Sequence, residues 1–128
     1  MHNNSEQHRA LALWAADCAE RVLPLFEDNH RGDGRPRAAI AAARAWAKGK
    51  MTVAEARKRA FAAHAAAREA GSETAREAAR AAGHAAATAH VPSHGPHAAN
   101  YALKAVIAAG GDDVAEEHWQ DASLPLSQ

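Results

Sequence analysis

The chain has 128 residues, and its 15 Lys and Arg residues balance 15 Asp and Glu residues, which makes the formal net charge zero. Alanine occupies 38 positions, whereas aromatic residues make up only 5 %. This composition excludes an ordinary β-sandwich, barrel or parallel sheet, because their faces need branched and aromatic side chains. One cysteine excludes an internal disulfide, and no apolar run approaches the roughly 18 residues of a membrane span.

The first predicted helix begins near Ser5 and carries one apolar stripe, formed by Leu11, Ala15, Cys18 and Val22. Pro24 ends this helix or kinks it, because proline cannot donate to the preceding turn. The polar residues before the helix lack the apolar segment of a signal peptide, which favours a cytoplasmic location.

The later helices are marked by their ends. Pro36 suits a first helical position, Thr52 with Glu55 forms a capping box, and Ser72 is a cap for the helix that follows. Residues 93–96 read as a turn, and Asp113 with Glu116 reads as a second capping box. These signals predict helices over 36–48, 53–70, 73–89, 97–109 and 114–119.

We therefore expect an all-α fold, a compact Ala-rich bundle of five to six antiparallel helices with the third to fifth helices at its centre. The expected organisation is a flexible segment over 1–8, a single helical domain over 9–123 and a tail over 124–128. Large side chains should anchor the ends and edges of the helices: Leu11, Trp14, Phe26, Trp46, Phe61, Tyr101 and Trp119.

Nine histidines are many for a chain of this length. His90, His94 and His97 lie close together in sequence. They are the one candidate set of metal ligands, since neutral imidazole commonly binds metal ions. Pro92 and Pro96 interrupt any helix that would align them, so we expect no metal and no other cofactor. The simpler expectation is that these histidines cap a helix end.

A second polar set lies among apolar residues: Asp17, Arg21, His64, His84 and Thr88. Buried polar groups need partners, and we expect Asp17 to meet a cation such as Arg44 or a histidine. The set forms either a structural network or the polar part of a ligand pocket. Cys18 lies on the apolar stripe and no catalytic motif accompanies it, so we expect no enzyme.

The charges are unevenly distributed although they balance. Residues 35–59 hold eight basic residues and one acid, whereas the chain after Gly111 holds five acids and no Lys or Arg. A basic stretch can bind phosphate, but this one is not interleaved with aromatic residues and carries no binding signature, so nucleic acid is disfavoured as a partner. The acidic end is the better candidate for a protein partner.

Several strings resemble the bacterial immunity protein family with the immunity-five-like domain. The strings are Asp17-Cys18-Ala19-Glu20-Arg21, Arg35-Pro36, Ala63-His64-Ala65 and Gly83-His84 through His90-Val91. The resemblance runs in order from about Arg9 to Pro125. It implies an all-α fold and a protein that binds and silences a bacterial toxin inside the producing cell. It supplies no catalytic residues.

The leading hypothesis is thus a non-catalytic protein that neutralises a cognate toxin. Its partner surface is the acidic last helix, with Asp112, Asp113, Glu116, Glu117 and Asp121, or the basic region of the second and third helices. The alternative is a self-resistance protein that holds a small natural product between helices. Its pocket candidates are Trp14, Asp17, Arg21, Trp46, His64, His84, Thr88, His90 and Tyr101. A His-rich metal-binding protein is the second alternative, and a homodimer is possible because Ala-rich faces bury easily against a copy.

Overall fold

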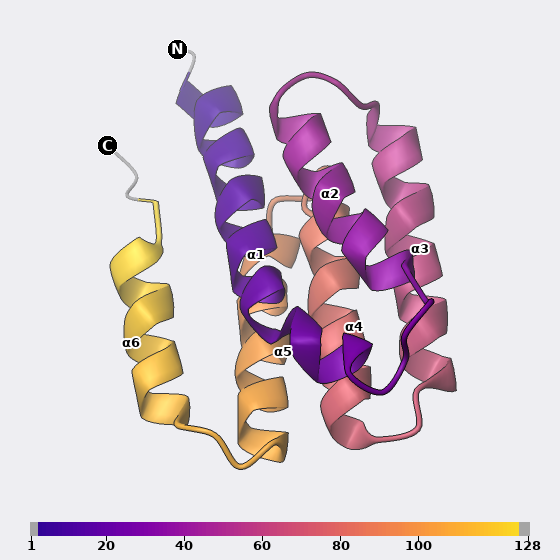
Figure 1. Ribbon diagram of the computed structural model, residues 1–128. Helices are drawn as coiled ribbons and strands as arrows, with labels where there is room; N and C mark the ends of the chain where they lie inside the picture. The colour runs from indigo at the N-terminus through magenta and orange to yellow at the C-terminus, as the bar shows by residue number, and fades with distance from the viewer. Residues whose placement is uncertain (1–2, 126–128) are drawn as a thin grey trace.

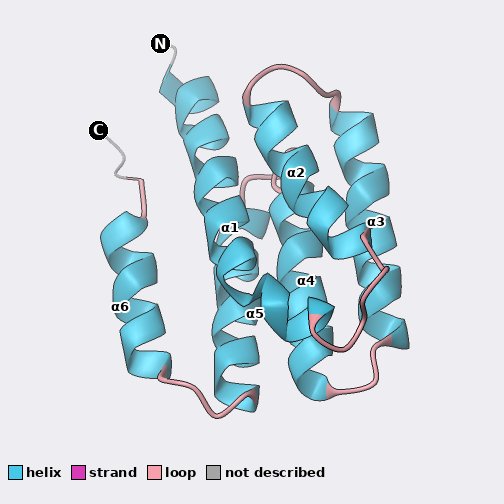
Figure 2. Cartoon of the chain, in the orientation of Figure 1, coloured by secondary structure: helices cyan, strands magenta, loops and turns pink. Residues whose placement is uncertain are grey.

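The computed structural model describes residues 3–125, and this part of the chain is a bundle of helices without strands (Figures 1 and 2). The helices are α1 (Asn3–Glu27), α2 (Arg35–Ala47), α3 (Val53–Glu69), α4 (Glu73–Ala87), α5 (His94–Ala108) and α6 (Asp113–Ser123). Successive helices reverse direction along the bundle (Figure 1). The expected all-α bundle is therefore confirmed. Over these residues no helix has the length and apolar character needed to span a membrane.

Helix α4 is at the centre of the bundle, where it contacts α1, α2, α3 and α5. Helix α3 lies at one edge and α6 at the opposite edge (Figure 1). The prediction of a central third helix is wrong, because the outer face of α3 carries the exposed charges of Arg57, Lys58 and Arg59. The burial of alanine alone does not distinguish a central helix from one that packs on a single side.

The core is made largely of alanine, and α4 contributes Ala78, Ala82 and Ala85 with no exposed surface. Small side chains let helix axes approach closely. The closest approaches occur at two glycines. A Cβ atom at Gly83 would lie 2.6 Å from the ring of His64 in α3, and one at Gly95 would lie 2.7 Å from Leu11 in α1.

Larger side chains seal the edges of this alanine core. Phe26 is fully buried and Trp14 is 7 % exposed, as expected of anchors. Phe61 is an exception, because 62 % of it is exposed on the outer face of α3. The sequence pattern mistakes Phe61 for an anchor because its neighbours are alanines, which fit a buried and an exposed face equally well.

The helix ends follow local chemistry. Thr52 and Glu55 form the predicted capping box, and the Ser72 hydroxyl accepts a hydrogen bond from the Ala75 amide. The cap of α6 is Asp112 instead of Asp113, since the Asp112 side chain accepts from the Ala115 amide. Pro24 lies inside α1 and does not end it.

Helix α5 begins at His94, so the predicted turn over 93–96 is wrong. Pro96 falls in the first turn of the helix, where the missing N–H has no intrahelical partner to lose. This earlier start places His94 and His97 three residues apart on a regular helix, which the sequence analysis did not expect.

The first helix also begins earlier than predicted. Residues 3–8 belong to α1, and His8 donates from Nε2 to the Thr88 carbonyl at 2.6 Å. Residues 3–8 are therefore helical, whereas the sequence predicted a flexible segment over 1–8. Of the predicted tail, Leu124 and Pro125 follow α6 without helical structure, and 126–128 lie outside the described residues.

Candidate functional site

The predicted aromatic pocket walls make their contacts at three separate places. The Trp14 indole donates to the Gln120 carbonyl at 3.1 Å, under α6. Trp46 packs against the His8 ring, with centroids 4.6 Å apart. Tyr101 stacks on His84 on the other side of the bundle's central helix. Each of these three aromatic residues therefore has a packing or hydrogen-bond partner within the described part of the chain.

A polar junction holds α6 against α1 and α5. The Arg21 guanidinium donates to both carboxylate oxygens of Glu116 at 2.9–3.1 Å and lies over the Trp119 ring at 4.1 Å. The Gln120 side-chain amide donates to the Ala99 carbonyl at 2.8 Å. Arg21 thus has a structural partner. The role of Gln120 was not predicted, because its partner Ala99 lies on another helix.

Asp17 meets Arg44 of α2, as the sequence analysis expected. The Arg44 guanidinium donates to Asp17 at 2.8 Å and to Glu20 at 2.7 Å. Both carboxylates are more than half exposed, so this is a surface ion pair and contributes at most about 1 kcal/mol. It lies beside an open groove of about 390 Å³ between α1 and α2, also lined by Ile40 and Lys48.

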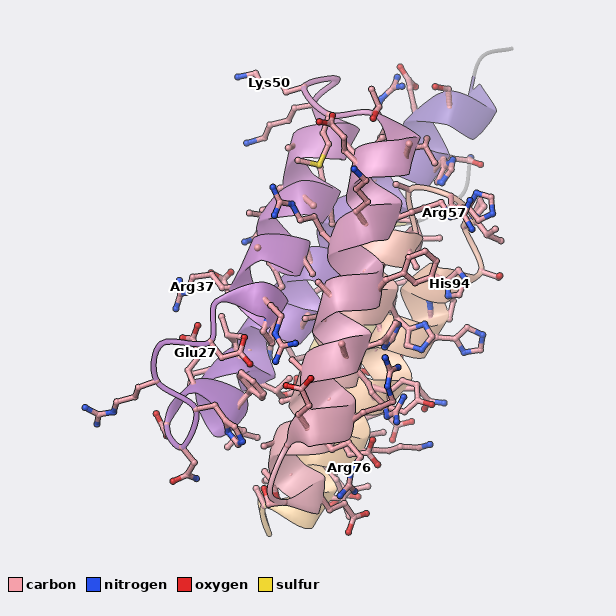
Figure 3. The ribbon with its side chains drawn as sticks, turned by 90° about the vertical axis from the view of Figure 1, so that its right-hand side faces the viewer. Glu27, Arg37, Lys50, Arg57, Arg76 and His94 are labelled. Atoms are coloured by element: carbon pink, nitrogen blue, oxygen red, sulfur yellow. The ribbon has the colours of Figure 1, made fainter. Side chains whose placement is uncertain are left out.

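Further ion pairs neutralise part of the basic stretch. Arg37 donates to both oxygens of Glu27, a pair that Figure 3 shows on the surface. Arg35 binds Asp33 and Glu69 at 2.7–2.9 Å, and these contacts raise the pKa of Arg35 and lower those of both carboxyl groups. Much of the arginine charge between residues 35 and 44 is therefore neutralised by ion pairs within the fold.

Four histidine rings gather where α3, α4 and α5 meet. His84 of α4 has its Nδ1 atom 2.9 Å from Nδ1 of His94. Its ring centroid lies 5.4 Å from that of His97 and 4.9 Å from that of His64. Tyr101 stacks on His84 with the two rings within 5° of parallel. We call His64, His84, His94 and His97 the histidine cluster.

The histidine cluster is partly sheltered from water, which disfavours charged rings. Burial, with smaller contributions from the neighbouring rings and Arg80, lowers the pKa of His84 to about 3. Burial likewise lowers the pKa values of His64 and His94. The neutral form of these three imidazoles is therefore favoured at pH 7.

His64 is the least satisfied member of the histidine cluster. Its Nδ1 atom is buried and has no hydrogen-bond partner among the described residues. Buried polar groups usually have a hydrogen-bond partner.

The structure corrects the histidine set chosen from sequence. His94 and His97 lie together as proposed, but the third ring beside them belongs to His84, whereas His90 is exposed and its side chain makes no hydrogen bond among the described residues. Thr88 is fully buried, and its hydroxyl donates to the His84 carbonyl at 2.9 Å. Thr88 therefore caps a carbonyl at the end of α4 and does not line a pocket.

Cys18 is fully buried and lies beside the α1–α6 junction. Burial, together with the charges of Glu116 and Asp17, raises the pKa of its thiol to about 12. A thiol that stays protonated at neutral pH is a poor nucleophile. The structure therefore agrees with its interpretation as a packing residue.

Some acidic residues at α6 stabilise the fold, and others are exposed on its surface. Glu116 is 7 % exposed and paired with Arg21, so it is wrong as a partner-surface candidate, and Asp112 is the helix cap. Asp113, Glu117 and Asp121 are exposed, recur at four-residue spacing and join no ion pair among the described residues. We call these three residues the acidic face of α6.

Comparison with known proteins identifies the family of this chain. A family model described as "Imm-5 like putative immunity protein" matches residues 1–127. The chain belongs to this family. No curated protein and no solved structure matches it significantly. The Imm-5 like family is that of the resemblance seen in the sequence, and membership agrees with a general role in immunity and with a protein that binds a partner.

Proposed function

We propose that the protein binds a toxin made by its own bacterium and blocks that toxin in the cytoplasm without catalysing a reaction. The observation that carries the proposal is the match of the immunity family model to residues 1–127. A buried thiol and the lack of a catalytic motif support a binding role.

The acidic face of α6 is the surface that we propose for the toxin. Asp113, Glu117 and Asp121 point the same way because they are four residues apart on a helix. Val114, which is 64 % exposed, adds an apolar side chain beside them. Unpaired charges of one sign speed the capture of a partner of opposite sign, so the toxin is expected to present a basic surface.

The proposed interface must extend beyond α6. A stable complex typically buries about 800 Å² on each partner, whereas an 11-residue helix is only about 16 Å long. Ile107 at the end of α5 is 55 % exposed and precedes α6 by a short turn. The end of α5 therefore supplies the adjoining part of the proposed surface.

The test is capture of the toxin followed by a growth assay. The tagged protein is purified from the producing strain, the retained protein is identified by mass spectrometry, and its affinity is measured with purified components. Expression of that partner alone should stop growth, and co-expression of this protein should restore it. A captured protein that is harmless, or a toxin that this protein does not relieve, contradicts the proposed function.

Charge reversal tests the proposed surface. The double variant E117K/D121K should bind the toxin at least tenfold more weakly, mainly through slower association at low salt. The control D28K/E73K makes the same change in net charge on other exposed residues and should bind as the wild type does. Equal weakening by both variants would show that only net charge matters and would remove α6 as the interface.

A further inference from the structure

The outer side of α3 carries positive charge that the fold does not neutralise. Residues 57–68 hold no acidic side chain and four basic ones, which are Arg57, Lys58, Arg59 and Arg68. All four are exposed, and none joins an ion pair among the described residues. Figure 3 faces this edge of the bundle. The edge is therefore free to attract negative charge from outside the molecule.

An aromatic side chain lies among these cations. Phe61 is 62 % exposed, and the Arg57 guanidinium lies 5.7 Å from the centre of its ring. Ala65 follows Phe61 by four residues and shares its side of the helix. Aromatic residues and arginine are enriched where proteins contact one another. We call Arg57, Lys58, Phe61 and Arg68 the basic face of α3.

The acidic face of α6 is complementary to the basic face of α3. The acidic residues span about 12 Å along the axis of their helix, and the basic residues span about 16 Å along theirs. Each set of charges has one exposed apolar side chain beside it, Phe61 on α3 and Val114 on α6. The two faces therefore match in length, in sign of charge and in the presence of an apolar contact.

These two faces lie at opposite edges of the bundle (Figure 1), so they do not meet within one molecule. Separate copies have no overall repulsion, because the formal net charge is zero. We propose that the acidic face of α6 of one molecule docks on the basic face of α3 of a second molecule. Since the contact joins two different surfaces, each copy keeps one face free, and assembly continues head to tail beyond a dimer.

The expected assembly is weak and sensitive to salt. A stable complex typically buries about 800 Å² on each partner, and the 11 residues of α6 present less than that. Ion pairs between exposed groups are also screened by salt. We therefore expect a dissociation constant of about 0.1 mM at low ionic strength. Docking covers the acidic face of α6, so a basic toxin would compete with it, and this consequence alone rests on the proposed function.

Sedimentation equilibrium of the purified, untagged protein tests the assembly. At pH 7.5 and about 20 mM ionic strength, where screening is weak, the average mass should rise with concentration. It should start at the 13.5 kDa of one chain and reach about twice that value near 0.1 mM protein. About 0.5 M sodium chloride should return the mass to that of one chain. Phe61→Ala leaves the net charge unchanged and should weaken the association about fivefold.

Two neutralising variants test which faces meet. R57Q/K58Q removes charge from the basic face and E117Q/D121N removes charge from the acidic face, so each alone should associate at least tenfold more weakly than the wild type. An equal mixture of the two variants contains one intact face of each kind per pair. The mixture should therefore form a complex of two chains that grows no further.

R31Q/K104Q is the matched control for R57Q/K58Q, because it neutralises two exposed cations outside the basic face of α3. It should associate as the wild type does, and circular dichroism checks that every variant is folded. The proposal is overturned if the wild type remains a single chain at 0.5 mM protein and low salt, or if R31Q/K104Q abolishes association. It is also overturned if the mixed variants stay monomeric or grow beyond two chains.

All these measurements use the purified protein alone. Failure of the assembly therefore leaves the toxin capture and growth assays unaffected, and failure of those assays leaves the assembly unaffected.

Discussion

Replacement of Gly83 by alanine is a direct test of how closely α3 and α4 pack. Alanine is favoured over glycine inside a helix by about 1 kcal/mol, so a Gly→Ala change in the middle of α4 would ordinarily stabilise the protein. Here the added Cβ would lie 2.6–2.8 Å from three ring atoms of His64. The ring cannot retreat freely, since His84 packs against it with centroids 4.9 Å apart.

The net effect follows from these two opposing terms. Overpacking of a filled site costs about 1–3 kcal/mol, which exceeds the helix propensity that alanine gains. We expect Gly83→Ala to lower the free energy of unfolding by about 1 kcal/mol, with a fall in Tm of about 3–6 °C. Urea titration at pH 7.5 and calorimetry measure the two quantities.

A double-mutant cycle isolates the clash. In the His64→Ala background the ring is absent, so Gly83→Ala should raise the free energy of unfolding by about 1 kcal/mol. The coupling between the two positions is then about 2 kcal/mol, far above the few tenths seen for independent sites. If Gly83→Ala stabilises both backgrounds equally, the close approach of α3 and α4 at this point is wrong.

Three further predictions concern other parts of the fold. The free energy of unfolding should fall as the pH decreases from 6.5 to 4.5, because the lowered pKa values of His64, His84 and His94 let the unfolded chain bind more protons; His84→Gln should flatten this slope in urea titrations. Glu116→Ala should lower the free energy of unfolding by about 1–2 kcal/mol, less than the loss of a fully buried pair, because the Arg21 side chain is 40 % exposed and regains water. Urea unfolding measures this loss, and a value below ~0.3 kcal/mol would contradict a structural role. Cys18 should resist a thiol reagent until the chain unfolds globally, and fast labelling of the native protein would refute its burial.

The local sequence was sufficient to predict most of the helix ends. Thr52 and Ser72 act as caps because the interaction spans only three residues, which the order of residues fixes by itself. Gly49 has a φ of 75°, as expected for a residue that ends a helix. The start of α5 was missed because Pro96 was treated as a helix breaker, although the first turn accepts proline.

The candidate site was predictable only in part. Asp17 and Arg44 could be paired from sequence because two helices joined by a short loop lie side by side. The Arg21–Glu116 pair joins residues 95 positions apart, and no local rule places α6 beside α1. The histidine cluster depends on the register of α3, α4 and α5, and the absence of a side chain at Gly83 leaves room for the His64 ring against α4.

The two polar assemblies of this alanine core differ in how completely their side chains are hydrogen-bonded. At the α1–α6 junction, Arg21, Glu116, Trp14 and Gln120 all have partners within the fold, so the junction needs nothing from outside and serves to hold α6 in place. In the histidine cluster, His64 Nδ1 is buried without a partner, and the rings of His84 and His94 bond only each other. Since an unsatisfied buried group costs about 1–3 kcal/mol, the histidine cluster contains an atom that lowers the stability of the fold, whereas the α1–α6 junction contains none among these four residues.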